Sequence, residues 1–334
     1  MRKITKSTQL FIILALTVLL SFCGTMRGMS YKKNDRTRGI DLLDLPPAKA
    51  QDLRVAMHFH HYGAAERILI NAITVEGGNQ QKCRLLNYLG GVYYFDGDYL
   101  HAAVAWSRSA AVAPLNPTIQ FSLAMAYIEI NHRGWAEQSI KKLAMQFPRN
   151  PLYPYWLGRI AYDKDHYSQC VSYFTHAIKL NPLMSIAYNN LGLCYFYSNE
   201  DEKAILAYKK AILLNAAKKH PSAWPYLNLA IAQELLNRPQ AAEINLQKSI
   251  HIDPEIPQAY FELGNISEHQ NKLQQSIAFY RHAVQLSPEY AQPHFSLARV
   301  YERLDDRAKA NAEVKIYMRL KREDELLSTD NREK

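Results

Sequence analysis

Residues 83–116 read CRLLNYLGGVYYFDGDYLHAAVAWSRSAAVAPLN, and residues 117–150 read PTIQFSLAMAYIEINHRGWAEQSIKKLAMQFPRN. When the two stretches are placed under one another, residues of the same class fall in the same columns. The alignment continues with further units that start at residues 151, 185, 223, 257 and 291. The chain therefore contains an internal repeat with a period of 34 residues, and such a period is a primary indicator of fold.

Five columns define the repeated unit. Column seven holds leucine in every unit: Leu89, Leu123, Leu157, Leu191, Leu229, Leu263 and Leu297. Column eight holds a small residue: Gly90, Ala124, Gly158, Gly192, Ala230, Gly264 and Ala298. Column twenty is also small: Ala102, Ala136, Cys170, Ala204, Ala242, Ser276 and Ala310. Column twenty-four is large, from Trp106 through Phe174 to Val314. Column thirty-two holds proline in five units: Pro114, Pro148, Pro182, Pro254 and Pro288.

These columns predict two helices in each unit. Apolar positions recur at helical spacing in two runs that are separated by a polar stretch, such as Asn199-Glu200-Asp201. Small residues at columns eight and twenty allow the two backbones to approach closely, and the large side chain at column twenty-four fills the adjoining groove. Proline at column thirty-two ends the second helix, because proline cannot continue a helix.

The pattern of columns resembles the tetratricopeptide repeat (TPR) in its period and residue types. The resemblance implies an all-α fold, a right-handed α–α superhelix of about seven to eight helix-turn-helix repeats. Seven units cover residues 83–320, and residues 46–82 are predicted to form a degenerate capping repeat. In that segment Tyr62, Ala65, Leu69 and Ala72 fit the second helix, but Asp52 stands where the repeat has leucine.

Two further departures from the pattern concern the end of the fourth unit and the end of the chain. In the fourth unit Ala216 replaces the proline, and four extra residues between Asn215 and Pro221 predict a longer loop or helix end. Residues 321–334 form a charged C-terminal tail. Hydrophobic residues make up 48% of the chain, which suffices for a core that accumulates along a stack of repeats.

The N-terminus has the layout of a secretory signal. Basic residues precede an apolar run from Leu10 to Leu20, which is short for a spanning helix. Leucine three residues before Cys23 resembles a bacterial lipobox, in which Cys23 would carry the lipid, although Phe22 departs from that pattern. Residues 1–23 are thus a signal peptide or membrane anchor, and three outcomes stay open: a lipoprotein, an uncleaved anchor or soluble export. The sequence favours a membrane-associated protein of the bacterial cell envelope, lipid-anchored, with its orientation open.

The positive charge belongs to the N-terminal segment. Residues 1–39 contain eight Lys or Arg and one acid, and so account for +7 of the formal net charge of +9. The repeats are nearly neutral and lack a basic stripe that could follow phosphates, so nucleic acid is not an expected partner. Residues 24–45 are interpreted as a basic linker that serves targeting or contacts anionic lipid headgroups.

Nothing in the sequence predicts catalysis, a cofactor or a metal site. The chain lacks GxSxG, GxxxxGK[ST], HExxH and GxGxxG motifs, and nearly every residue after 46 belongs to a repeat. His58, His60 and His61 are interpreted as a solvated helix face, because no carboxylate or cysteine completes a metal site. Cys170 is interpreted as a core side chain, and a disulfide with Cys194 on the adjacent helix is the alternative.

The resemblance also implies which columns face a partner. In TPR arrays the first helices line the concave surface, and columns two, five, nine, twelve and thirteen point into it. The predicted partner-binding groove therefore contains Asn87, Tyr94, Phe121, Met125, Tyr155, Arg159, Tyr162, Asn189, Leu193, Phe196, Phe261, Phe295 and Arg299. Column twelve changes from aromatic to acidic along the chain, ending in Glu234, Glu268 and Glu302. The lysines and asparagines with which chaperone-binding relatives grip a C-terminal carboxylate do not match here.

Taken together, these features predict a non-enzymatic, membrane-associated adaptor. It would bind a peptide or helix of a partner protein in the groove, in the assembly of an envelope complex. The alternatives are a self-associating structural element and a regulatory subunit of an enzyme complex, because both roles use the same surfaces.

Overall fold

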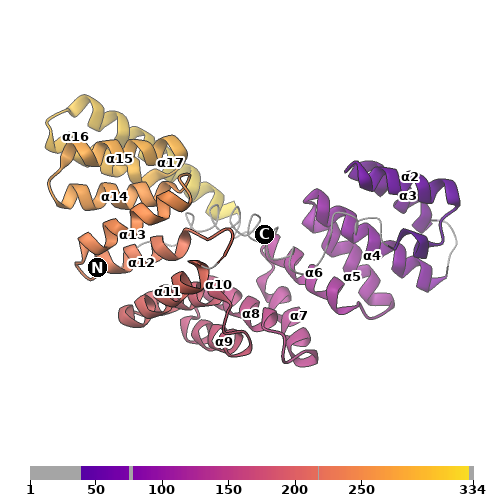
Figure 1. The fold of residues 1–334 in the computed structure, drawn as a ribbon. Helices are drawn as coiled ribbons and strands as arrows, with labels where there is room; N and C mark the ends of the chain where they lie inside the picture. The colour runs from indigo at the N-terminus through magenta and orange to yellow at the C-terminus, as the bar shows by residue number, and fades with distance from the viewer. Residues whose placement is uncertain (1–38, 75–77, 217, 331–334) are drawn as a thin grey trace. The chain divides into compact units, whose positions relative to one another are not determined.

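The computed structural model describes residues 39–74, 78–216 and 218–330, and the described part of the chain is a succession of helices (Figure 1). A short 3-10 helix, η1 (Ile40–Leu43), precedes the first α-helices, α2 (Pro47–His58) and α3 (Tyr62–Thr74). The first helices of the seven units are α4 (Asn79–Asp96), α6 (Pro117–Glu129), α8 (Leu152–Asp163), α10 (Ser185–Tyr197), α12 (Trp224–Leu235), α14 (Pro257–His269) and α16 (Ala291–Arg303). The second helices are α5 (Tyr99–Val112), α7 (Arg133–Gln146), α9 (Tyr167–Leu180), α11 (Asp201–Ala216), α13 (Pro239–Ile252), α15 (Leu273–Leu286) and α17 (Arg307–Asp330). No strand occurs among these residues, and the predicted all-α repeat fold is confirmed.

Between Lys164 and Asp165 the described chain divides into two compact parts, each of which contains several of the 34-residue repeats. We call these parts the N-terminal unit and the C-terminal unit. In the N-terminal unit each helix packs on the next from α2 to α8, and in the C-terminal unit the same succession runs from α9 to α17. Within the C-terminal unit the first helices also touch one another, α10 with α12 and α12 with α14. This contact between first helices places their columns on one continuous face.

The small residues of column eight lie directly against the large residues of column twenty-four. A Cβ atom built on Gly264 would lie 2.4 Å from Cε1 of Tyr280, and one built on Gly90 would lie 2.4 Å from Nε1 of Trp106. Gly192 meets Tyr208 in the same way, again at 2.4 Å. A ring thus occupies the volume that a methyl group would need, and the predicted close packing of the two helices in a unit is present in three separate units.

Column fifteen turns the chain between the two helices of every unit. Its residues adopt the left-handed backbone conformation, with positive φ: Gly97, Asn131, Asp165, Asn199, Asn237, Asn271 and Asp305. The following amide closes the turn, as when the Arg238 N–H donates to the Gln233 carbonyl at 2.9 Å. Glycine, asparagine and aspartate occur here because they tolerate positive φ better than other residues. The sequence showed this position only as part of a polar stretch.

We expect Asn237→Ala to lower the free energy of unfolding by about 1 kcal/mol, because alanine pays the steric cost of the left-handed conformation at φ 57. Asn237→Gly is the matched control and should retain or slightly raise stability. Urea denaturation followed by circular dichroism measures both variants. Equal stability of the two variants would contradict the assignment of a left-handed backbone at this position.

Proline ends the second helices where the sequence predicts. The last helical residues of α13 and α15, Ile252 and Leu286, each lie two positions before a proline. In the fourth unit, which lacks this proline, α11 continues to Ala216. Asn215 is buried and holds the longer connection, because its Nδ2 donates to the Ser222 carbonyl at 2.7 Å and its Oδ1 accepts from the Ser222 N–H at 3.1 Å.

The two ends of the solenoid are closed differently. In the segment predicted as a capping repeat, Asp52 is exposed and the next residue, Leu53, is fully buried in its place. Ile40 and Leu43 of η1 cover the same hydrophobic cluster. At the other end α17 does not stop near residue 320 but continues through the predicted charged tail to Asp330.

A disulfide joins Cys170 of α9 to Cys194 of α10, with Cα atoms 6.0 Å apart. Both side chains are fully buried, so Cys170 fills the small-residue column of the core and also forms the bond that the sequence left as the alternative. Cys83 is a buried free thiol.

Cys23 and the predicted signal or anchor lie outside the described residues. Within the part that the structure describes, every helix is too short or too polar to cross a membrane.

Candidate binding surface on the first helices

In the N-terminal unit most of the predicted groove residues are buried. Phe121 is 8% exposed, and its ring centroid lies 5.9 Å from that of Tyr153 and 6.4 Å from that of Trp156. The other buried members are Met125, Tyr155 and Tyr162. These side chains are therefore part of the packing between helices, and a partner would reach little of their surface.

The remaining predicted residues of this unit are half-buried. Tyr94 packs between Tyr99 and Trp106, with centroids 5.2 and 5.7 Å away, and burial raises the pKa of its hydroxyl. The backbone carbonyl of Asn87 accepts a hydrogen bond from Nε1 of Trp106 at 3.0 Å. The Arg159 guanidinium lies over the ring of Trp156, with Cζ 5.9 Å from its centroid.

In the C-terminal unit the predicted residues become more accessible toward the end of the chain. Asn189 is buried and accepts from Nδ2 of Asn228 at 3.0 Å, which links α10 to α12. Leu193 and Phe196 are half-buried against the core of α11 and α12. Phe261 is half-buried between Tyr280 and Tyr290, with centroids 5.8 and 5.4 Å away.

Phe295 and Arg299 of α16 are the exposed members of the predicted set. Phe295 is 49% exposed, and Cζ of Arg299 lies 5.9 Å from its ring centroid. Phe295 occupies the same column as the buried Phe121, so this column changes from core to surface along the chain. We define Phe261, Phe295, Arg299 and the acidic side chains described next as the C-terminal first-helix surface.

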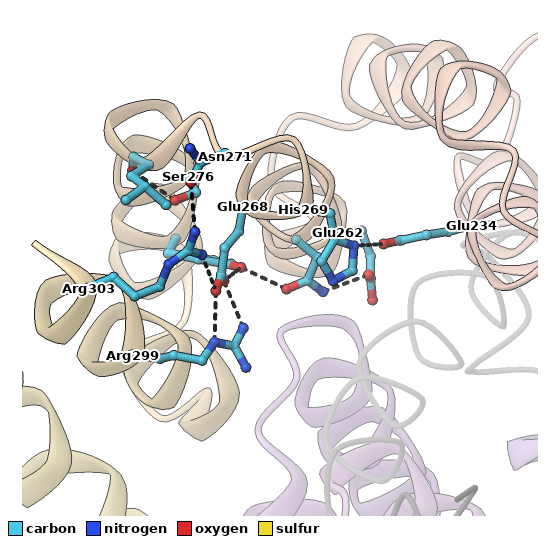
Figure 2. A network of polar contacts seen from close by, with 11 residues as sticks. Glu234, Glu262, Glu268, His269, Asn271, Ser276, Arg299 and Arg303 are labelled. Carbon is cyan, nitrogen blue, oxygen red and sulfur yellow. Dashed lines mark hydrogen bonds and ion pairs between the residues drawn. The ribbon is translucent and has the colours of Figure 1, made fainter.

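Glu268 on α14 is the centre of a polar network that joins α14 to α16 (Figure 2). Arg299 binds its carboxylate with both forks of the guanidinium, from Nε at 2.8 Å and from Nη2 at 2.7 Å. Arg303 adds an Nη1 contact at 3.3 Å, and the Tyr280 hydroxyl donates at 2.8 Å. Burial alone would raise the pKa of Glu268, but hydrogen bonds from Arg299 and Tyr280 hold it below its usual range. This carboxylate is therefore ionised and satisfied, and it fixes the position of α16 against α14.

Two further carboxyl groups of this face, those of Glu234 on α12 and Glu262 on α14, have different partners from Glu268 (Figure 2). Burial, together with the charge of Glu234 on α12, raises the pKa of Glu262 on α14 to about 7. Asn265 donates to Oε2 of Glu262 at 2.9 Å. Nδ1 of His269 lies 3.4 Å from Oε1 of Glu234. Burial and the neighbouring carboxyl group thus act in the same direction on the pKa of Glu262, because both disfavour its charged form.

The columns that the sequence assigns to the groove include some of the acidic side chains of this surface. Glu234 and Glu268 belong to column twelve, but Glu262 belongs to column six, which the resemblance does not place in the groove. The available signal was the polar character of column six in three successive units, at Asn190, Asn228 and Glu262. A polar residue directly before the invariant leucine column indicates contact with the neighbouring repeat, as the bond between Asn228 and Asn189 shows.

Among residues 39–74, 78–216 and 218–330, no group of three His, Cys, Asp or Glu side chains is placed to hold a metal ion. His60, which the sequence places on a solvated face, adopts a left-handed turn conformation, and its Nδ1 lies 2.9 Å from the Tyr62 hydroxyl. What the surface offers is an exposed aromatic ring, a bidentate arginine and a pair of acids.

Comparison with known proteins agrees with the repeat. Two tetratricopeptide-repeat family models match the chain, one over residues 155–223 and one over residues 257–290. No curated protein matches the sequence significantly.

Among solved structures, a tetratricopeptide repeat protein from Parabacteroides merdae is similar at 15% identity and a TM-score of 0.61, covering 81% of this chain and 98% of its own. PilW, described as a widely conserved type IV pilus biogenesis factor, has 20% identity and a TM-score of 0.54, with coverage of 59% and 90%. The Cut9–Hcn1 hetero-tetramer of the APC/C has 18% identity and a TM-score of 0.57, and the likeness covers 79% of this chain and 53% of that one.

At these identities the solved structures establish the fold, and the two family models establish the repeat. Solenoids of this kind present extended surfaces to protein partners. The chain contains tetratricopeptide repeats, and its fold is the helical repeat of solved tetratricopeptide-repeat proteins.

Proposed function

We propose that the chain is a non-enzymatic adaptor that binds a segment of a partner protein on the C-terminal first-helix surface. The observation that carries this proposal is the exposure of Phe295, which is 49% accessible in a column where Phe121 is only 8% accessible. An exposed aromatic ring beside a fixed arginine is typical of an interface anchor. Half-buried Phe261 on the preceding first helix extends the apolar part of this surface.

The surface suits an extended peptide or one face of an amphipathic helix. Arg299 is held by Glu268 at 2.7 Å and lies beside Phe295, so its position does not have to be fixed on binding. A preorganised side chain loses little conformational freedom when a partner arrives. The groove of the N-terminal unit is a weaker candidate, because its aromatic side chains are already buried.

A library of random 12-residue peptides displayed on phage tests the proposal when it is selected against the folded chain. We expect peptides selected on the wild type to bind the Phe295→Ala variant about tenfold more weakly, since a tenfold loss corresponds to about 1.4 kcal/mol. Leu213→Ala is the matched control. Leu213 is exposed on α11, which belongs to the same C-terminal unit but is the second helix of a different repeat. Equal loss in both variants, or no peptide selected at all, would refute binding at this surface.

We further propose that the N-terminal segment tethers the scaffold to a bacterial membrane and that Cys23 carries the lipid. The apolar run before Cys23 and the basic residues after it support the tether. The disulfide between Cys170 and Cys194 supports export, because disulfides persist in oxidising compartments. Such a tethered scaffold suits a role in envelope assembly. If Cys23→Ser leaves processing and membrane fractionation unchanged, lipidation at this residue is wrong.

A further inference from the structure

Core positions of the repeat lie on the surface of α17, the second helix of the seventh repeat. Column twenty-four is 40% exposed there, at Val314, but at most 3% exposed in the six earlier repeats: Trp106, Ile140, Phe174, Tyr208, Leu246 and Tyr280. Column twenty-seven is half-buried there, at Tyr317, but at most 1% exposed in the same six repeats: Ser109, Leu143, Ala177, Ala211, Ser249 and Ala283. The second helices of the earlier repeats thus have a cover over these columns that α17 does not have.

The cover of the earlier second helices is the first helix of the following repeat. α13 packs on α14, and α15 packs on α16. The disulfide shows which columns meet, because it joins Cys170 in column twenty of α9 to Cys194 in column ten of α10. Within the part of the chain that the structure describes, no helix follows α17. Column ten is at most 2% exposed in every repeat: Val92, Ala126, Ile160, Cys194, Ala232, Ile266 and Val300.

The earlier repeats also show which residues a covering helix needs. Column three of a first helix faces the preceding repeat, as Tyr153 does when it covers Phe121. Columns seven and ten share a hydrophobic cluster with column twenty-four of the preceding repeat, as Leu229 and Ala232 do with Tyr208. Columns three, seven and ten are spaced i, i+4 and i+7, which is one face of an α-helix. A helix with apolar residues at this spacing therefore fits a second helix of this chain.

The exposed face of α17 is apolar at its centre and basic at its rim. Met318 is 58% exposed and lies one turn after Val314. Both line a shallow hollow, whose other residues are Lys315, Arg319, Arg322, Glu323 and Leu326. Three cations against one carboxylate leave the rim positive, which favours an acidic partner. Phe295 adjoins this face, because its ring centroid lies 5.2 Å from that of Tyr317.

We propose that an acidic amphipathic helix of the partner protein binds the end face of the seventh repeat, in the place that a following first helix takes in the earlier repeats. This end face consists of Phe295, Val314, Tyr317 and Met318. The inference rests on the proposed function, because Phe295 belongs to both surfaces, and it adds the conformation and the charge of the partner. Charge favours this occupant over two others. Residues 1–39 hold eight Lys or Arg against one acid, and a second copy of α17 would bring the same three cations to the rim.

A synthetic peptide of about 16 residues tests the proposal, because a helix of this length can form on binding. The peptide has leucine at i, i+4 and i+7 and glutamate at the outward positions. Its controls are a scrambled peptide of the same composition and a peptide with lysine in place of glutamate. We expect the acidic peptide to bind the full-length chain about tenfold more tightly than either control, measured by fluorescence anisotropy. The circular dichroism of the mixture should show more helix than the sum of the separate spectra.

A variant of the apolar centre locates the binding. Met318→Glu should weaken the binding of the acidic peptide about tenfold, since it places a carboxylate in the middle of the apolar face. Because Met318 is exposed, this variant should keep the helical spectrum and the melting temperature of the wild type. Ala312→Glu is the matched control and should bind the peptide normally, because Ala312 is exposed on the same helix but lies outside the hollow.

Charge reversal gives a readout that a loss of folding could not produce. Lys315→Glu combined with Arg322→Glu makes the rim acidic. The preference should then change sign, so that the lysine peptide binds this double variant more tightly than the glutamate peptide does. An unchanged preference for the glutamate peptide would show that the rim does not select the partner, and would overturn the inference.

The results separate this inference from the proposed function. Library peptides that depend on Phe295 but bind Met318→Glu unchanged and gain no helix would overturn the inference and leave the adaptor function intact. A wild-type chain that is dimeric by light scattering, and that Met318→Glu makes monomeric, would assign the end face to a second copy and also overturn it. If neither the library nor the designed peptide yields binding, both the inference and the adaptor function are wrong.

Discussion

Replacing Tyr280 by alanine is expected to lower the free energy of unfolding of the last repeats by about 3–5 kcal/mol, the usual range for removing a large buried aromatic ring. Tyr280 is fully buried and lies in the space left by the missing side chain of Gly264. Its hydroxyl also donates to Glu268 at 2.8 Å. The variant would therefore open a cavity between α14 and α15 and remove one donor from the network that holds α16.

Two further variants separate these contributions. Tyr280→Phe keeps the ring and removes the hydroxyl, and should cost about 1 kcal/mol because Glu268 keeps its arginines. Gly264→Ala keeps the ring and adds a Cβ atom 2.4 Å from it, and the overpacking should cost about 1–3 kcal/mol. Hydrogen exchange measured by mass spectrometry should show faster exchange in α14 to α16 and little change in α4 to α7, since each repeat contacts only its neighbours. A loss for Tyr280→Ala smaller than that for Tyr280→Phe would contradict this packing.

Reduction of the disulfide between Cys170 and Cys194 is expected to lower the free energy of unfolding of the C-terminal unit by about 3.5 kcal/mol, the loop-closure value for a loop of this length. The two cysteines are separated by 24 positions in the sequence and join α9 to α10. Because both are fully buried, the protein should be unfolded with reductant and refolded before the comparison. Urea denaturation of the oxidised and reduced forms measures the difference.

A double variant, Cys170→Ala with Cys194→Ala, controls for other effects of the reductant. Its free energy of unfolding should match that of the reduced wild type, apart from the loss caused by removing two buried sulfur atoms. Added reductant should not change it. Cys83 is a buried free thiol in the other unit and is present in both proteins. Non-reducing mass spectrometry that finds free thiols at both positions would show that the bond does not form.

The packing within a repeat was predictable because the same solution occurs many times in the sequence. Gly90, Gly192 and Gly264 stand in one column, and each meets the large residue sixteen positions later. The left-handed residue of column fifteen was not predicted, although asparagine, aspartate or glycine fills it in every unit. These residues also occur in turns of many other kinds, so composition alone could not distinguish the backbone conformation.

The candidate surface was less predictable than the packing. Phe121 and Phe295 occupy the same column, but one is buried and the other is half exposed. The difference comes from neighbours such as Tyr153 and Trp156, which lie on the first helix of the next repeat and cover Phe121. A column assignment indicates the direction of a side chain and carries no information about what the adjacent repeat places over it.

The sequence by itself determined the number of repeats, the two helices in each and the residues at which they pack, because each of these depends on contacts at short and regular separations along the chain. The tertiary structure alone decided which groove residues reach the surface and that Glu234 raises the pKa of Glu262. Both outcomes depend on side chains that come from different repeats, 28 residues apart in the case of the two glutamates. The distance and burial of such pairs, and hence their charge, arise only when the helices are stacked.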